Sequence, residues 1–220
     1  NDMNIQCIRS GMTNCWLVRW SGRTILIDAG SAADRSFAAR LARIIYPRMI
    51  ELLVLTHGHA DHVGHASLLR EQFGIPVALS AADLPLVHAA SLCVPPACTP
   101  LGRLTRGSLI RQMAKSRYPG FTPDFFLPDG LPPSVNLIPC PGHTPGSCAL
   151  LIGESLFAGD AAMRIISTGM PWFAEDTAAA WQSLIRISGI ARCTVYPGHG
   201  HPFRIEKLQH IFKQKQRNFL

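Results

Sequence analysis

The chain has 220 residues, of which 47% are hydrophobic, enough to bury the core of one sizeable domain or two small ones. Its seven cysteines form no C-x-x-C pair, which argues against a disulfide framework, and no apolar run or leader pattern predicts a membrane span or a signal peptide. The formal net charge is +7, but the basic stretch 103–117 lacks the stacking aromatics of a nucleic-acid surface. We therefore expect a cytoplasmic monomer or homodimer that binds a small molecule rather than nucleic acid or a membrane.

Two similar halves are predicted along the chain, each with a β-hairpin, an amphipathic helix and an apolar strand. In the first half these elements cover residues 15–18 with 24–27, 32–46 and 52–55, and a further helix covers residues 61–73. In the second half they cover residues 148–152 with 156–158, 176–188 and 194–196. Asp28 then corresponds to Asp160, and His57 corresponds to His199. Two sheets placed back to back would bring these residues to one edge.

The segment between the halves, residues 81–133, fits neither repeat. Its prolines leave room for a long helix only near residues 105–117. Aromatic side chains such as Tyr118 and Phe121 argue against disorder, and insertions of this length commonly form lids or binding loops. We expect the insertion to fold over the groove between the halves and to shape a substrate pocket. Trp172, in a loop of the second half, is a further candidate for that pocket.

A cluster of imidazoles and a carboxylate follows the apolar run 52–55. It reads Thr-His-Gly-His-Ala-Asp-His over residues 56–62. Imidazole is the commonest protein ligand for zinc, and carboxylate often accompanies it. A strand that ends in such a cluster delivers several ligands to one place, so the pattern predicts a metal site.

Further ligand candidates lie where other predicted strands end. His143 lies in a Gly/Pro-rich turn, Asp160 ends an apolar run, and His199 follows a strand in the turn Pro-Gly-His. With the cluster they make five histidines and two aspartates, which is too many for one tetrahedral ion. Two ions that share a bridging carboxylate would use all seven.

The ordered set of motifs resembles the metallo-β-lactamase superfamily. The matching motifs are H-x-H-x-D-H at residues 57–62, then G-H-T-P-G-S, G-D and P-G-H. The resemblance runs from Asn14 to about His199 and implies one domain over residues 1–220, folded as a four-layer αββα sandwich with an insertion at about 81–133. It implies that a first metal ion is held by His57, His59 and His143, and that a second is held by Asp61, His62 and His199. Asp160 would bridge the two ions, and Asp28 would support the ligand loops.

The chemistry that follows is metal-dependent hydrolysis. A hydroxide held between two divalent ions would attack the carbonyl carbon of an ester, a thioester or a lactone. Zinc is the expected metal, with iron or manganese as alternatives, and Asp61 would also exchange a proton with the leaving group. The substrate is expected to be small, and the basic balance of the chain favours an anionic one.

The ligand pattern is closest to glyoxalase II and to acyl-homoserine lactonases, because zinc β-lactamases lack the bridging aspartate. Tyr118 and Tyr196 are the candidates for the carbonyl-positioning tyrosine of the lactonases, and Phe121 and Trp172 are the candidates for the pocket wall. Two alternatives keep the same fold. One is a mononuclear iron persulfide dioxygenase, and the other is a phosphodiesterase or nuclease.

Overall fold

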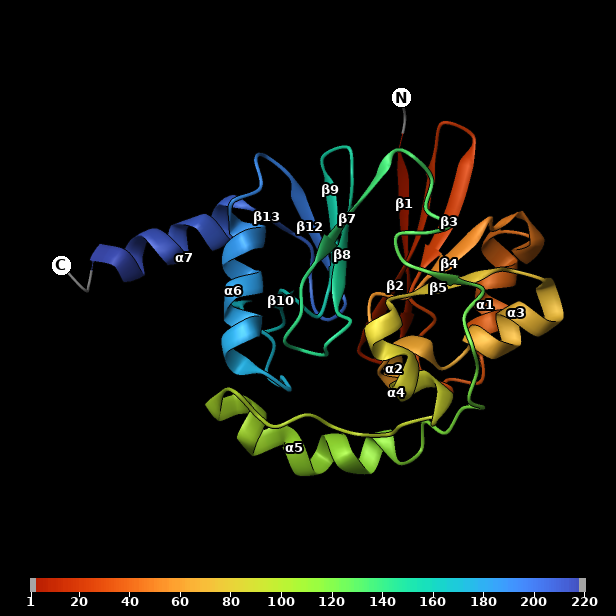
Figure 1. Ribbon diagram of the computed structural model, residues 1–220, viewed down its shortest axis with the longest axis horizontal. Coiled ribbons are helices and arrows are strands. Elements are labelled where there is room, and N and C mark those ends of the chain that lie inside the picture. Colours follow the sequence, from red (N-terminus) through yellow and green to blue (C-terminus); the bar gives the residue numbers. More distant parts are fainter. Residues whose placement is uncertain (1–2, 218–220) are drawn as a thin grey trace.

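Two β-sheets face each other at the centre of the computed structural model, which describes residues 3–217 (Figure 1). The first sheet has the strand order β1-β2-β3-β4-β5-β6, and the second has the order β13-β12-β9-β8-β7. The strands of the first sheet are β1 (Asn4–Ser10), β2 (Thr13–Trp20), β3 (Arg23–Ile27), β4 (Leu52–Val54), β5 (Val77–Leu79) and β6 (Phe125–Phe126). Those of the second are β7 (Val135–Pro139), β8 (Cys148–Ile152), β9 (Ser155–Gly159), β12 (Thr194–Pro197) and β13 (Phe203–Arg204). A separate small hairpin contains β10 (Met163–Arg164) and β11 (Thr168–Gly169).

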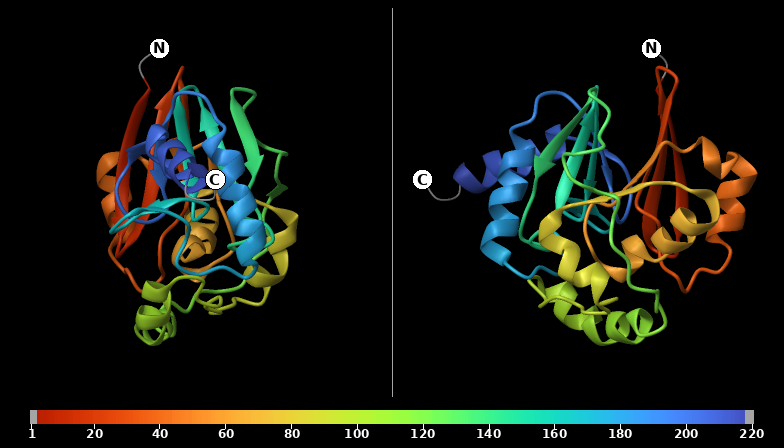
Figure 2. Two further views of the ribbon diagram at one scale, coloured as in Figure 1. Left: turned by 90° about the vertical axis from the view of Figure 1, so that its left-hand side faces the viewer. Right: turned by 45° about the vertical axis from the view of Figure 1, so that its right-hand side comes forward.

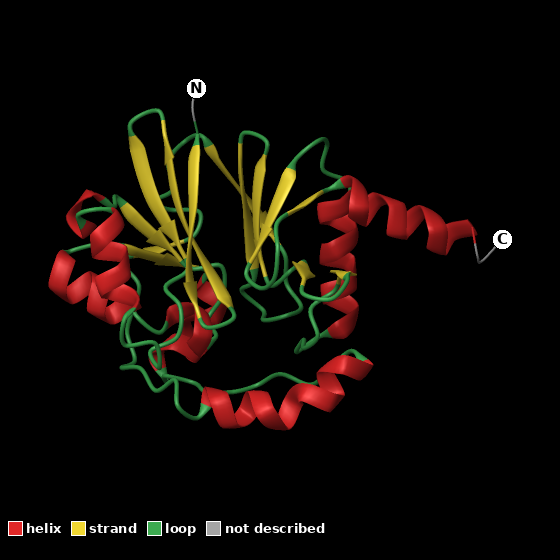
Figure 3. Ribbon diagram, turned by 180° about the vertical axis from the view of Figure 1, so that it is seen from behind, coloured by secondary structure: helices red, strands yellow, loops and turns green. Residues whose placement is uncertain are grey.

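Helices cover the outer face of each sheet, α1 and α3 beside the first and α6 beside the second (Figures 1 and 3). Helix α7 starts next to α6 and extends away from the sandwich. The helices are α1 (Phe37–Ile44), α2 (Ala60–Val63), α3 (Ala66–Phe73), α4 (Leu84–His88), α5 (Pro100–Met113), α6 (Thr177–Ser188) and α7 (Glu206–Arg217), with short 3-10 turns at Pro47–Met49 and Ala81–Asp83. Across residues 3–217, none of them combines the length and the apolarity that crossing a bilayer requires.

The core divides into three layers of packed side chains, which agree with the predicted αββα sandwich. Alternation along β2 shows how they separate: Cys15 and Leu17 pack toward the helices of the first half, whereas Trp16 and Val18 pack toward the second sheet. Phe157 of β9 completes the layer between the sheets. A third layer lies between the second sheet and its helices. The predicted fold class is therefore confirmed.

The strands that precede Asp28, His57, Asp160 and His199 are paired in parallel within each half. In the first sheet β3 pairs in parallel with β4, and in the second β9 pairs in parallel with β12. Parallel neighbours end at the same edge of a sheet, and the two sheets lie face to face. The loops after these strands therefore meet at one end of the sandwich.

Two predicted helices differ from the observed ones. The helix expected over residues 32–46 covers only Phe37–Ile44, because the Asp34 carboxylate accepts hydrogen bonds from the backbone N–H and hydroxyl of Ser36 and holds a turn there. The helix expected over residues 61–73 is broken into α2 and α3. The break is at Gly64, where a Cβ atom would lie 2.2 Å from the backbone nitrogen of Ala32.

The segment 81–133 contains α4, α5 and β6, and β6 adds an edge strand to the first sheet. The helix expected near residues 105–117 is α5, which starts and ends earlier, at Pro100 and Met113. Its start is fixed by Thr99, whose side chain accepts a hydrogen bond from the backbone N–H of Gly102. Figure 2 shows α5 lying apart from both sheets, beneath the two halves of the sandwich.

Candidate metal centre

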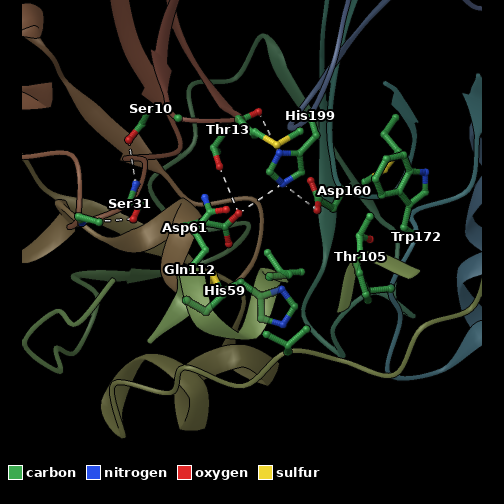
Figure 4. A pocket seen from close by; sticks show the side chains of 18 of the residues that line it. Ser10, Thr13, Ser31, His59, Asp61, Thr105, Gln112, Asp160, Trp172 and His199 are labelled. Carbon is green, nitrogen blue, oxygen red and sulfur yellow. Dashed lines mark hydrogen bonds and ion pairs between the residues drawn. The ribbon is translucent and has the colours of Figure 1, made fainter. Parts of the chain in front are cut away.

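The seven predicted ligands lie together at the edge where the parallel strands end. Figure 4 shows His59, Asp61, Asp160 and His199 of this set around the pocket. The loop after β4 and the start of α2 carry four of them, at residues 57–62. The loop between β7 and β8 carries His143, and the residues directly after β9 and β12 carry Asp160 and His199. Nitrogen and oxygen atoms of these side chains form three groups, and within each group all ligand atoms lie within 4.8 Å of one another.

The inner group consists of His57, His59 and His143, which are all buried. The Nδ1 atom of His59 lies 2.9 Å from the Nε2 atom of His143. The other ring nitrogen of His143 faces the carbonyl oxygen of Phe173 at 2.7 Å, so it carries the proton and Nε2 offers a lone pair. A cation would be held by such lone pairs.

The outer group consists of Asp61, His62 and His199, of which only His62 is fully buried. The Nε2 atom of His199 lies 3.4 Å from Asp61 Oδ2 and 3.3 Å from His62 Nε2. Thr13 holds the same Asp61 oxygen through a hydroxyl hydrogen bond of 3.1 Å. One carboxylate and two imidazoles make a ligand set suited to a divalent transition metal.

Asp160 joins the two groups. One carboxylate oxygen lies 3.5 Å from His62 Nε2. The other oxygen lies 3.4 Å from the Nε2 atom of His143 and 3.3 Å from that of His199. A single carboxylate therefore faces imidazoles of both the inner and the outer group, which is the arrangement expected of a bridging ligand.

Hydrogen bonds to the second ring nitrogen fix the orientation of most of the imidazoles. The acceptors are the hydroxyl of Thr56 for His57, the carboxylate of Asp28 for His62, the carbonyl of Phe173 for His143 and the carbonyl of Met12 for His199. Such contacts set the tautomer that leaves the other nitrogen free to bind a metal.

The remaining polar atoms fit a bound cation. Nε2 of His57, Nε2 of His59 and Oδ1 of Asp160 are buried and have no hydrogen-bond partner among the described residues. Buried polar atoms without partners are costly, and the donor set of imidazoles and carboxylates matches that of zinc and iron sites. Residues 3–217 thus provide a site that fits divalent metal ions.

The two groups differ in their electrostatics. Burial lowers the pKa of His59 to about 3 and also lowers the pKa values of His57 and His143. Burial also opposes a charge on His62, but neighbouring carboxylates outweigh it and raise the pKa of His62 to about 9. The inner imidazoles are therefore neutral ligands, whereas the outer group favours positive charge beside its carboxylates.

Asp28, predicted as a supporting carboxylate, contacts His62 of the outer group. The residue directly follows β3 and has a left-handed backbone with φ of 63°. Its carboxylate accepts hydrogen bonds from the backbone N–H of Thr56 at 2.8 Å and from His62 Nδ1 at 2.8 Å. A strained backbone at this place is consistent with a positioning role.

Asp83 supports the inner group, a role that was not predicted from the sequence. Its buried carboxylate accepts hydrogen bonds of 2.7 Å from the backbone N–H of Gly58, from the hydroxyl of Thr144 and from the backbone N–H of Gly146. Gly58 lies between two inner ligands, and Thr144 follows the third. Asp83 therefore ties together ligand loops from both halves, a role that an isolated aspartate inside the insertion did not reveal.

Two residues of the β1–β2 region also went unpredicted as parts of the site. Thr13 binds Asp61, and the side chain of Asn14 donates hydrogen bonds of 3.0 and 2.8 Å to the carbonyls of Pro197 and Gly200. These bonds hold the loop that carries His199. A threonine and an asparagine at a turn are common in many proteins, so the sequence contained no signal that distinguished them.

Of the four aromatic residues predicted to bind substrate, Trp172 lines the cavity beside the metal ligands. Tyr118 and Phe121 are 7% exposed, pack in the core of the first half and do not line that cavity. Tyr196 packs between Trp16 and Phe157, with ring centroids 5.1 Å from each. The expected substrate contact is wrong for these three residues, because their rings are needed to fill the core.

Comparison with known proteins identifies a family. The family model described as the metallo-beta-lactamase superfamily matches residues 8–199, a span that includes all seven predicted ligands. A solved structure, TTHA1623 in a di-iron-bound form, has a TM-score of 0.69 and 27% sequence identity, with 91% of this chain and 94% of that one covered.

Two curated relatives illustrate the range of names in the family. The probable metallo-hydrolase YflN of Bacillus subtilis is 27% identical over an alignment of 205 residues that covers 81% of this chain and 75% of that protein. A hydroxyacylglutathione hydrolase of Shewanella denitrificans is 26% identical over an alignment of 157 residues that covers 67% of this chain and 46% of that protein. The chain spans 59% and 56% of two longer animal relatives, from Drosophila melanogaster and Caenorhabditis elegans, which are named beta-lactamase-like protein 2 homologs.

Proposed function

The chain belongs to the metallo-beta-lactamase superfamily, and from this premise we propose that it is a hydrolase with two divalent metal ions that cleaves an ester, thioester or lactone. The inner group would hold one ion and the outer group the other. Zinc is the metal that we propose, because imidazole and carboxylate ligands suit it. Iron is the alternative, since TTHA1623 binds two iron ions with a similar fold.

The position of Asp160 carries the proposal of two ions. Its two oxygens lie 3.5 Å from His62 and 3.4 Å from His143, which belong to different groups. A site for one ion would need three or four ligands and would leave the other buried imidazoles without a role. Two ions that share Asp160 give each of the seven side chains a function.

Bound ions would supply a nucleophile from water at neutral pH and would polarise the carbonyl oxygen of the substrate. The chain itself would handle the proton. Asp61 lies at the cavity wall, and its Oδ2 atom is oriented by the hydroxyl of Thr13 at 3.1 Å. We propose that the Asp61 carboxylate accepts a proton from the attacking water and then delivers that proton to the leaving group, as a carboxylate within reach of the reacting atoms can do.

The class of scissile bond has one further support. The relative from Shewanella denitrificans is named a hydroxyacylglutathione hydrolase, and such a name denotes a thioester substrate. Esters and lactones present the same carbonyl carbon to a nucleophile. We therefore include all three bonds in the proposal.

A substrate panel with one variant tests this function. Purified protein reconstituted with Zn²⁺ is assayed with chromogenic esters, thioesters, lactones and phosphodiesters, alongside Asp160→Ala and the exposed control Asp129→Ala. We expect carbonyl substrates to be hydrolysed, Asp160→Ala to lose roughly 10³-fold in kcat/KM, and Asp129→Ala to retain it. Phosphodiester cleavage alone would contradict the proposal. Oxygen consumption with a persulfide at one iron per chain would favour the dioxygenase.

A further inference from the structure

We propose that the cavity beside the metal ligands is built for a substrate with a large apolar group, such as a medium-length acyl chain, rather than for a small polar acid. This inference rests on the proposed function for the bond that is cleaved. It concerns a different part of the site, namely the walls of the cavity. The cavity has a volume of about 730 Å³, within the range of about 300–1,000 Å³ typical of pockets that enclose drug-sized ligands.

Most of the surface that lines the cavity is apolar. Leu109 and Met113 of α5 form one wall together with Val94 and Pro95. Four further apolar side chains, Met163, Ile165, Trp172 and Phe173, also line the cavity. Val94, Met113, Met163 and Phe173 are each at most 9% exposed, so these walls are already packed from behind.

Besides the predicted metal ligands, the charged side chains of the described residues that line the cavity are Arg9, Asp34 and Arg40. Arg40 is paired with Asp34 through a contact of 2.7 Å, which leaves Arg9 as an exposed cation at the rim. The basic side chains of α5 do not line the cavity, and Arg106 donates a hydrogen bond of 3.1 Å to the carbonyl of Val94 instead. The basic side chains that give the chain its positive charge are thus not concentrated where a substrate would lie.

The segments 93–98 and 172–174, which contribute residues to the cavity walls, are joined by backbone hydrogen bonds. The N–H of Cys98 donates to the carbonyl of Trp172 at 3.0 Å, and that of Ala174 donates to the carbonyl of Pro96 at 3.0 Å. At the start of α5, a Cβ atom on Gly102 would lie 2.3 Å from the Trp172 carbonyl oxygen, so the helix contacts that loop directly. The apolar surface is therefore preorganised, which favours binding of an apolar group.

Phe173, in the segment 172–174, connects these walls to the inner group. Phe173 forms an isolated β-bridge with Ala97, and its carbonyl oxygen lies 2.7 Å from Nδ1 of His143. The apolar walls and the metal ligands thus have a fixed relative position. A substrate whose carbonyl group lies at the metal ligands would place its apolar group against α5.

A series of esters with a common leaving group tests the inference. An acetyl group leaves most of the wall in contact with water, whereas an octanoyl group covers it. Burial of each added methylene is worth about fourfold in kcat/KM. We expect kcat/KM to rise at least tenfold from the acetate to the octanoate ester. A flat or falling series with measurable hydrolysis would overturn the inference and would leave the proposed function standing.

Two substitutions on the same helix provide a matched pair. Leu109→Asp places a charge in the apolar wall and is expected to lower kcat/KM for the octanoate ester at least tenfold, with the acetate ester changed less than threefold. Leu104→Asp is the control, because Leu104 is 81% exposed and lies outside the cavity wall. Should Leu109→Asp fail to fold, Leu109→Ala is expected to reduce the preference for octanoate severalfold. Equal effects of the Leu109 and Leu104 changes on both esters would count against the inference.

Binding of the carboxylate products provides a readout that does not depend on catalysis. By calorimetry we expect octanoate to bind at least tenfold more tightly than acetate, and Leu109→Asp to abolish the difference. If no ester is hydrolysed but this difference is seen, the proposed function fails while the apolar cavity stands. If octanoate and acetate bind equally, the inference about the cavity is wrong.

Discussion

The inner and outer ligand groups are held by the fold in different ways. The inner imidazoles are at most 5% exposed, and Asp83 ties together the loops that carry them. In the outer group, the side chains of Asp61 and His199 are 19% and 14% exposed and are held by the β1–β2 turn. The inner group is therefore buried and held from both halves, whereas the outer group is partly exposed to the cavity. The difference suggests that the two ions would be retained unequally.

Removal of one ligand from each group is expected to have the largest effect. Both His59→Ala and His199→Ala should lower hydrolysis by roughly 10³-fold, because each disrupts one of the proposed ions. After dialysis, elemental analysis should show less metal in His59→Ala than in His199→Ala, since the more exposed group loses its ion more readily. His201→Ala is the control, because His201 is exposed and adjacent to the site. Equal metal loss in the two variants would contradict the inferred difference between the inner and outer groups.

Substitution of the supporting carboxylates should weaken metal binding at one group at a time, with a smaller effect than removal of a ligand. Asp83→Asn should weaken binding of the inner ion by about 10–100-fold, and Asp28→Asn should do the same to the outer ion. Competition with a chelator measures both affinities, and Asp129→Asn, at an exposed position, is the control. A loss confined to the outer ion in Asp83→Asn would show that the contacts of Asp83 do not govern the inner group.

Gly64 offers a test through stability. A Cβ atom there would lie 2.2 Å from Ala32 N and 2.6 Å from Gly30 O, both backbone atoms. Gly64→Ala should therefore lower the free energy of unfolding by about 1–3 kcal/mol and should displace α2, which carries Asp61 and His62. Gly107→Ala in α5 is the control and should be neutral or stabilising by up to about 1 kcal/mol, because its Cβ would meet no atom closer than 3.9 Å. Urea unfolding measures both; an unchanged Gly64→Ala midpoint would contradict this packing.

The smallest effect lies outside both groups, at the ion pair of Asp34 and Arg40. The hydrogen bond from Arg40 lowers the pKa of Asp34, so the pair stabilises the fold above the unfolded pKa near 3.9, and this contribution is lost as the pH falls through the lower folded pKa. Asp34→Asn should cost about 0.5–1 kcal/mol at pH 7, since both side chains are partly exposed. The difference from the wild type should shrink below about pH 4, as urea unfolding at several pH values would show. A difference that grows toward acid pH would contradict this account.

The fold and the ligand positions were predictable because their signals are local and ordered. Apolar runs that stop at His57, Asp160 and His199 indicate strand ends, and parallel strand ends meet at one edge of a sheet. The structure brings all seven predicted ligands together there. The break at Gly64 was not predictable, because it depends on close approach to the backbone of Ala32, a contact made only in the folded chain.

The supporting and substrate-contacting residues were harder to predict for a different reason. Asp83 acts through three contacts with residues distant in sequence, and nothing around it in the chain marks that role. Aromatic residues fill cores as often as pockets, so Tyr118 and Tyr196 could not be separated from Trp172 by type alone. The role of residues 81–133 as a lid that shapes the substrate pocket stays a prediction, although α5 lines the cavity.

Titration of metal-free protein with Zn²⁺ tests the central claim of a two-ion site most directly. Calorimetry and hydrolysis are followed together as metal is added. The account predicts two ions per chain, with a tighter first event at the inner group and full activity reached only after the second equivalent. Full activity at one equivalent, with no further binding, would contradict it.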